Sequence, residues 1–139
     1  MAPGSTVAIV APAGPPNLDR LQNSIQFLKD HGYNIKLFAQ ARTKFGYLAG
    51  DDGVRAEAIL KAFADANING ILCARGGYGC LRILPLLDYK IIKANPKPIV
   101  GYSDITAILL AIYTKCGLVT FHGPMPAVEF GNKLKRFTT

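Results

Sequence analysis

The chain has 139 residues, half of them hydrophobic, and 16 Lys and Arg against 9 Asp and Glu give it a formal net charge of +7 at pH 7. This length suits one domain with its own hydrophobic core, and a charged fraction of only 18% excludes a disordered chain. The basic residues are scattered and are not interleaved with aromatic ones, so we expect no nucleic acid as a partner.

The cysteines and the N-terminal residues indicate neither a cofactor nor a membrane. Cys73, Cys80 and Cys116 are odd in number and form no C-x-x-C pair, so they predict neither disulfides nor a metal site. The first residues lack a signal-peptide pattern, and no stretch is long and apolar enough to cross a membrane. We therefore expect a cytoplasmic protein that needs no metal or other cofactor and has no membrane partner.

The first part of the chain alternates short apolar runs with a helical pattern. Residues 6–11 and 33–38 are predicted to be strands. Between them, a proline-rich loop at 12–16 leads into a helix that Asn17 caps and Gly32 ends. The order strand, helix, strand is typical of a sheet with parallel strands.

The next part repeats this alternation. A loop at 43–52 precedes a helix over 53–66, which is followed by a strand at 68–74 and a glycine-rich turn at 76–79. The side of this helix that faces the core is expected to carry Val54, Ala58, Leu60 and Phe63.

The second half adds two further strands. A short helix that Pro85 breaks or bends is followed by a strand at 99–100, a helix from Ile105 that stops near Gly117, and a last strand at 118–121. Strands that alternate with helices predict an α/β fold. Because crossovers are right-handed, the simplest topology is a flavodoxin-like doubly wound parallel sheet with helices on both faces.

Ser103 stands at a sharp turn between the strand at 99–100 and the helix that begins at Ile105. Free N–H groups and the positive end of the helix dipole favour negative charge there, which suits a serine that attacks a carbonyl. A serine before a helix is also a common N-cap, and the sequence GYSDI at 101–105 keeps only the first glycine of the nucleophile elbow G-x-S-x-G. The local motif leaves both a nucleophile and a cap open.

Two further turns are expected at the carboxyl edge of the same sheet, where such folds bind ligands. The turn at 76–79 matches neither the dinucleotide nor the P-loop pattern, but its N–H groups could hold an oxyanion or a phosphate. Arg75, just before it, suits either a structural ion pair or a substrate carboxylate. The turn after the last strand carries His122, a candidate general base.

Four motifs occur in order along the chain: YLAGDD at 47–52, ARGGYG at 74–79, GYSDIT at 101–106 and FHGPM at 121–125. Together they resemble the LD-carboxypeptidases of serine peptidase type. These are the muramoyltetrapeptide carboxypeptidases and their relatives, the microcin C immunity proteins. The resemblance runs from about Ser5 to Met125.

The resemblance implies roles for individual residues. Ser103 matches the nucleophile of the family, and the backbone N–H groups of Gly77 and Asp104 match its oxyanion donors. We expect the substrate to be bound by residues of the same turns, namely Arg75, Gly76, Tyr78 and His122.

The family completes its catalytic triad with a Glu and a His from a C-terminal domain, whereas this chain ends at Thr139. We therefore expect residues 1–126 to be the N-terminal nucleophile domain and residues 127–139 to begin a linker to an absent C-terminal domain. Because the family's base lies in that second domain, the resemblance implies that His122 shapes the cleft and that the isolated chain is inactive.

The resemblance implies a serine hydrolase that removes the terminal D-alanine from murein tetrapeptides in peptidoglycan recycling, with a murein-derived peptide as its partner. A relative that cleaves peptidyl nucleotides is the alternative inside the family. A non-catalytic flavodoxin-like module that binds phosphate at 76–79 is the alternative outside it.

The turns at the carboxyl edge are also expected to form an apolar patch when no second domain covers them. This patch would contain Tyr78, Tyr102, Phe121 and Met125. Large exposed apolar patches tend to bind partners, so we expect the chain to form a homo-oligomer through this face. The alternative is a monomer whose loops fold over the edge.

Overall fold

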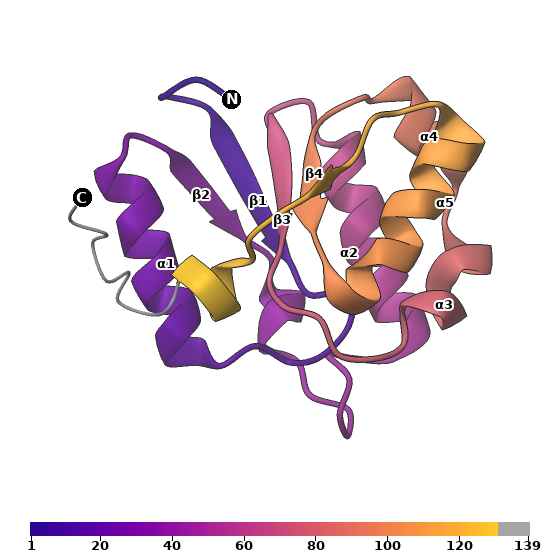
Figure 1. The fold of residues 1–139 in the computed structure, drawn as a ribbon, viewed down its shortest axis with the longest axis horizontal. Helices are drawn as coiled ribbons and strands as arrows, with labels where there is room; N and C mark the ends of the chain where they lie inside the picture. Colours follow the sequence, from indigo (N-terminus) through magenta and orange to yellow (C-terminus); the bar gives the residue numbers. More distant parts are fainter. Residues whose placement is uncertain (131–139) are drawn as a thin grey trace.

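The computed structural model of the chain describes residues 1–130 and shows a five-stranded sheet within them (Figure 1). The strands lie in the order β2-β1-β3-β4-β5, and each neighbouring pair is parallel. They are β1 (Thr6–Val10), β2 (Asn34–Leu37), β3 (Gly70–Cys73), β4 (Ile99–Gly101) and β5 (Phe121–His122). This is the flavodoxin-like order, with a topological switch point between β1 and β3.

Helices cover both faces of the sheet. Helix α1 lies on one face, and α2, α4 and α5 lie on the other (Figure 1). The helices are α1 (Leu18–Asp30), α2 (Asp52–Ala64), α3 (Cys80–Ile83), α4 (Tyr89–Ala94) and α5 (Thr106–Cys116). The predicted α/β fold with a parallel sheet and helices on both faces is confirmed.

Alternate residues of the central strands point to opposite faces and fill two hydrophobic cores. In β1, Ala8 and Val10 belong to the core that includes α2 and α5, whereas Val7 and Ile9 belong to the core under α1. Strands buried on both faces must be apolar at every position, which explains the continuous apolar runs of β1 and β3.

The last strand is shorter and begins later than its sequence pattern predicts. It covers Phe121–His122 instead of 118–121 and pairs with Val100 and Gly101 of β4. The residues before it approach α5 instead, where the Thr120 hydroxyl donates to the carbonyl oxygen of Leu109 at 3.2 Å. The apolar run therefore packs in part against a helix and only its end joins the sheet.

The buried side of α2 is predicted only in part. Ala58 and Phe63 are buried, but Val54 is 36% exposed and Leu60 is only half-buried. Arg55 is fully buried on this helix, because backbone carbonyl groups from three loops surround its guanidinium group.

The last described segment is a π-helical turn, Pro126–Phe130, that packs against α1. Ser24 of α1 is buried, and its hydroxyl donates to the carbonyl oxygen of Pro126. The proposed division of the chain after residue 126 stays a prediction, and residues 131–139 of the predicted linker lie outside the described residues.

Candidate active site

The turn after β4 holds Ser103 in a backbone conformation that side chains rarely adopt. Its φ angle is +59°, and within residues 1–130 it is the one non-glycine residue with a positive φ. This left-handed conformation costs an L-residue about 1–2 kcal/mol, so the surrounding structure must enforce it. Ser103 is exposed and begins the 3₁₀ turn Ser103–Ile105, from which α5 follows directly.

This conformation argues against the N-cap alternative for Ser103. An N-cap residue has an extended backbone, and its side chain accepts a hydrogen bond from an N–H group of the first turn. The backbone of Ser103 is left-handed, and both its 3₁₀ turn and α5 begin without a side-chain cap. An exposed, strained serine between a parallel strand and a helix has the geometry of a nucleophile elbow instead.

The glycine-rich turn at 76–79 lies directly against Ser103. A Cβ atom on Gly76 would lie 3.0 Å from the Cβ atom of Ser103 and 3.1 Å from its Oγ atom, so a side chain there would crowd the serine. Gly77 has a φ of +135°, and a Cβ atom on it would lie 3.0 Å from the backbone nitrogen of Gly14. Gly76 thus allows the close approach to the serine, and Gly77 allows the close approach to the loop at Gly14.

Asp104 connects the serine turn to the glycine-rich turn. Its Oδ2 atom accepts a hydrogen bond from the backbone N–H of Cys80 at 3.0 Å. The backbone nitrogen of Asp104 lies 3.6 Å from where a Cβ atom on Gly76 would be. The two oxyanion donors implied by the family resemblance, Gly77 and Asp104, thus come from adjacent turns, and their role as donors stays a prediction.

Arg75 and Tyr78 are both exposed, and they flank Gly76 and Gly77 in the sequence. The Nη1 atom of Arg75 donates to the carbonyl oxygen of Pro15 at 3.2 Å, which places this side chain over the proline-rich loop. Tyr78 meets Tyr47 edge to face, with ring centres 5.8 Å apart, and the two rings line an open hollow. Substrate binding by Arg75, Gly76 and Tyr78 stays a prediction.

His122 is exposed at the end of β5, with its ring centre 5.7 Å from that of Tyr102. The Tyr102 hydroxyl donates to Glu129, whose other carboxylate oxygen accepts a hydrogen bond from the Met125 N–H at 2.9 Å. Burial raises the pKa of Glu129, but these hydrogen bonds outweigh burial and hold the pKa below its ordinary value. Sequence reasoning missed this role of Glu129, because no local pattern links it to Tyr102.

The cysteine nearest to the site is buried. The Cys80 side chain is fully enclosed, with its sulfur atom 3.8 Å from the carbonyl oxygen of Pro12. Burial, and then the neighbouring Asp104 carboxylate, raise the pKa of the Cys80 thiol far above its ordinary value. A thiol that stays protonated is a poor nucleophile, so Ser103 is the better candidate for covalent chemistry.

The predicted apolar patch is found only in part. Tyr78 and Phe121 are exposed and Tyr102 is half-buried, but Met125 is 1% exposed and belongs to the hydrophobic core. Met125 packs into the core that includes α2 and α5, and its backbone N–H donates to Glu129. Within residues 1–130, no helix has the length and apolar character needed to cross a membrane. The same residues contain no cluster of three or more His, Cys, Asp or Glu arranged to hold a metal ion.

Comparison with known proteins identifies the family of this chain. Residues 7–123 match the model of the LD-carboxypeptidase N-terminal domain. Since this match covers most of the chain, the chain belongs to the LD-carboxypeptidase family, as its four motifs predict.

Individual relatives share both sequence and fold with the chain. The "Probable murein peptide carboxypeptidase" of Bacillus subtilis (strain 168) is 41% identical over 128 residues, which are 92% of this chain and 40% of that protein. The crystal structure of muramoyltetrapeptide carboxypeptidase from Oxalobacter formigenes has a TM-score of 0.85 at 32% identity, over 96% of this chain and 45% of that one. The structure of MccF in complex with glutamyl sulfamoyl guanosine has a TM-score of 0.94 at 32% identity, over 97% and 41% of the two chains. The chain thus spans less than half the length of these relatives.

Proposed function

We propose that this chain is the nucleophile-bearing domain of a serine LD-carboxypeptidase that removes the terminal D-alanine from murein-derived tetrapeptides. The observation that carries the proposal is the backbone of Ser103, held at φ +59° between β4 and α5 with its side chain exposed. Such strain persists where the surrounding structure over-determines it, and it clusters at active sites. The names of the Bacillus subtilis and Oxalobacter formigenes relatives support murein peptides as the substrate class.

In the proposed reaction, the Oγ atom of Ser103 attacks the carbonyl carbon of the peptide bond before the terminal D-alanine. The carbonyl oxygen becomes an oxyanion, which accepts hydrogen bonds from the backbone N–H groups of Gly77 and Asp104. A base takes the Ser103 hydroxyl proton during the attack and returns it to the amine when the intermediate collapses, so that the C–N bond breaks and D-alanine leaves. Water then hydrolyses the acyl-serine, which releases the shortened peptide as a carboxylate and restores the Ser103 hydroxyl. A single oxyanion donor of this kind contributes about 10²–10³ in kcat.

Arg75 is the proposed partner of the terminal carboxylate of the peptide. Arg75 is exposed and directly precedes Gly76, the residue whose backbone lies against Ser103. A planar guanidinium group binds a carboxylate through two parallel hydrogen bonds. Tyr78 and His122 are proposed to line the same cleft.

Proton transfer requires a base, and within residues 1–130 no hydrogen bond joins a histidine to Ser103. His31 is bonded to the carbonyl oxygen of Phe27 on α1, and His122 lies beside the Tyr102 ring. The family resemblance assigns the relay to a Glu and a His of a C-terminal domain, and on that assignment we expect the isolated chain to be inactive.

The test is a chimera in which residues 1–126 replace the matching part of the Bacillus subtilis relative, assayed for release of D-alanine from murein tetrapeptide. We expect the chimera to be active and Ser103→Ala to lower its kcat by a factor of about 10³ or more without unfolding it. Ser5→Ala is the matched control, because Ser5 precedes β1 at the opposite edge of the sheet. Full activity of the Ser103→Ala chimera would overturn the proposal.

A second candidate is hydrolysis of a peptidyl nucleotide, favoured by the TM-score of 0.94 with MccF bound to glutamyl sulfamoyl guanosine. The same chimera and the Bacillus subtilis parent are assayed on both substrates. A higher ratio of nucleotide to tetrapeptide kcat/KM in the chimera than in the parent would favour this candidate. Binding of inorganic phosphate at 76–79, with a chimera that is folded but inactive, would favour the non-catalytic module.

A further inference from the structure

Arg55, near the start of α2, has the largest fully buried side chain within residues 1–130. Its guanidinium group donates to three backbone carbonyl oxygens: to that of Gly50 at 3.1 Å, of Pro12 at 2.8 Å and of Gly79 at 3.0 Å. Burial of a charged group is strongly unfavourable unless its donors are satisfied. The three carbonyl groups satisfy them, and in return the guanidinium group holds three separate loops together.

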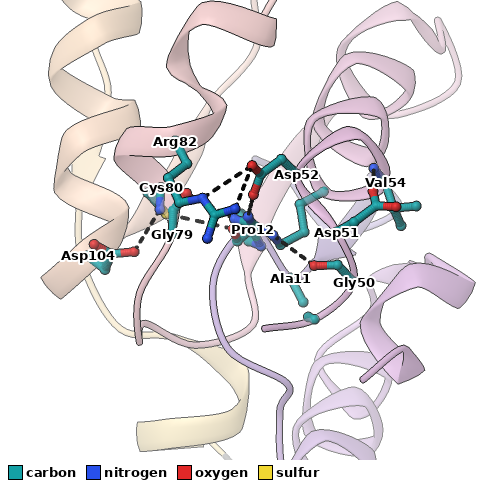
Figure 2. A network of polar contacts seen from close by, with 12 residues as sticks. Ala11, Pro12, Gly50, Asp51, Asp52, Val54, Gly79, Cys80, Arg82 and Asp104 are labelled. Atoms are coloured by element: carbon teal, nitrogen blue, oxygen red, sulfur yellow. Dashed lines mark hydrogen bonds and ion pairs between the residues drawn. The ribbon is translucent and has the colours of Figure 1, made fainter. Parts of the chain in front are cut away.

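The charge of Arg55 is balanced by Asp52 at the start of α2. One carboxylate oxygen of Asp52 pairs with Arg55, and the other accepts hydrogen bonds from Nε of Arg82 at 3.2 Å and pairs with its Nη2 at 3.0 Å (Figure 2). Arg82 lies on α3 with a side chain that is 59% exposed. Two arginines therefore share one carboxylate, and it is the buried Arg55 that also binds the loop carbonyl groups.

Two of the loops that Arg55 binds support the surroundings of Ser103, because the glycine-rich turn lies against Ser103 and the loop after Pro12 is bonded to that turn. Pro12 begins the loop in which the Gly14 N–H donates to the carbonyl oxygen of Gly76 at 3.1 Å. Gly79 ends the glycine-rich turn with a φ of +97°, and a Cβ atom on it would lie 2.8 Å from Nη1 of Arg55. The turn therefore closes directly over the guanidinium group.

We propose that Arg55 is a positioning residue of the active site: it holds the carbonyl groups of Pro12 and Gly79, fixes the turn at 76–79 and thereby orients the Gly77 N–H group toward the reacting carbonyl oxygen. Arg55 touches no substrate and acts through the backbone. The inference rests on the proposed function, in which Gly77 is an oxyanion donor. The proposal requires an arginine. Its planar guanidinium group carries five N–H donors in a fixed geometry, whereas the ammonium group of a lysine is a compact point charge.

The first test measures amide hydrogen exchange in the 139-residue chain carrying Arg55→Lys. This substitution keeps the positive charge but removes the planar guanidinium group. The reporters are the N–H groups of Gly14 and Cys80, which are bonded to Gly76 and to Asp104. We expect them to exchange about tenfold faster or more, while the amides of β1 and β3 keep their protection. Arg82→Lys is the matched control, since Arg82 binds the same carboxylate, and we expect it to leave both reporters unchanged.

A buried lysine ammonium group can prevent folding, so Arg55→Gln provides a second variant. Glutamine keeps two amide donors and brings no charge into the core. We expect the same faster exchange of the two reporters. If Gly14 and Cys80 exchange at the parent rate in a folded Arg55→Lys or Arg55→Gln chain, the inference is overturned.

The second test compares kcat and KM of the chimera with and without Arg55→Lys and Arg55→Gln. A misplaced oxyanion donor weakens the transition state and leaves ground-state binding intact, so we expect kcat to fall by about 10²-fold and KM to stay within about twofold. A purely structural role would lower the fraction of folded enzyme and leave kcat per folded molecule unchanged, which would contradict the inference.

The two tests separate this inference from the proposed function. Faster exchange of Gly14 and Cys80 in the Arg55 variants supports the positioning of the turn even if the Ser103→Ala chimera proves fully active and the hydrolase proposal fails. Unchanged exchange together with an inactive Ser103→Ala chimera overturns the role of Arg55 and supports the hydrolase.

Discussion

The carboxylate of Asp104 and the backbone N–H of Cys80 are joined by a hydrogen bond of 3.0 Å. This contact links the residue after the candidate nucleophile to the start of α3, and so fixes the serine turn relative to the glycine-rich turn. Arg55 holds the same glycine-rich turn through the Gly79 carbonyl group. Asp104 therefore has two proposed roles, since its backbone N–H is an oxyanion donor and its side chain is an anchor.

Removal of this anchor is expected to destabilise the chain. Asp104→Ala should lower the free energy of unfolding by about 1 kcal/mol, the usual loss when a side chain that bonds a helix N-terminus is removed. Asp104→Asn keeps an acceptor oxygen, so we expect it to lose less than half as much. Urea unfolding of the chain, followed by circular dichroism, measures both. Equal losses would show that the charge of Asp104 matters and the hydrogen bond does not.

The strained backbone of Ser103 predicts an unusual order of stability among its variants. Glycine adopts a φ of +59° freely, whereas alanine keeps the strain of the serine. We therefore expect the Ser103→Gly chain to be more stable than the Ser103→Ala chain by about 1 kcal/mol. In a regular helix or strand the order would be reversed. The same urea titration measures the difference, and an alanine variant at least as stable as the glycine variant would argue against strain.

The three cysteines are expected to be unreactive in the folded chain. Cys73, Cys80 and Cys116 are all buried, and burial raises the pKa of each thiol, that of Cys73 to about 12. Each thiol is therefore protonated at pH 8, and a protonated thiol attacks disulfides poorly. An aromatic disulfide reagent should label no thiol in the native chain at pH 8 and all three in urea. Fast labelling of Cys80 in the native chain would instead support the Cys80 thiol as a nucleophile.

The fold could be predicted from the sequence because its signals are local. Asn17 was predicted as an N-cap, and its Oδ1 atom accepts the Arg20 N–H at 3.0 Å. The apolar runs of β1 and β3 have the composition of strands buried on both faces, and the helical patterns between them require parallel strands. The last strand was misplaced because an apolar run such as 118–121 can pack under a helix as readily as in a sheet.

The supports of the candidate site could not be predicted in the same way. Arginine is rarely buried, so Arg55 reads in a helical pattern as a residue that faces solvent. Its partners Pro12 and Gly79 lie 43 and 24 residues away, and only the folded chain brings them together. Glu129 and Tyr102 present the same difficulty, since 27 residues separate them. The motifs of the site were visible, but the residues that fix its geometry were not.

Glu129 is expected to make the stability of the chain depend on pH. Burial alone would raise the pKa of its carboxyl group, but hydrogen bonds from the Met125 N–H and the Tyr102 hydroxyl favour the charged form and bring the pKa below its ordinary value of 4.5. A carboxyl group with a lowered pKa in the folded state stabilises the fold above its unfolded-state pKa. That contribution is lost as the pH falls through the folded-state pKa.

Glu129→Gln removes this contribution and allows it to be measured. At pH 7 we expect the variant to be less stable than the parent by about 1 kcal/mol, because the hydrogen bonds to a charged carboxylate are replaced by weaker ones. The parent carboxyl group becomes protonated as the pH falls through its lowered folded-state pKa, so the difference should shrink toward zero there. Glu57→Gln is the matched control for loss of one charge, since Glu57 is exposed and pairs with Lys61 on the surface of α2. Urea unfolding at pH 7 and at a series of lower pH values gives the comparison. A difference that keeps the same size across the whole acid series would show that the Glu129 carboxylate does not bind the Tyr102 hydroxyl as the structure describes.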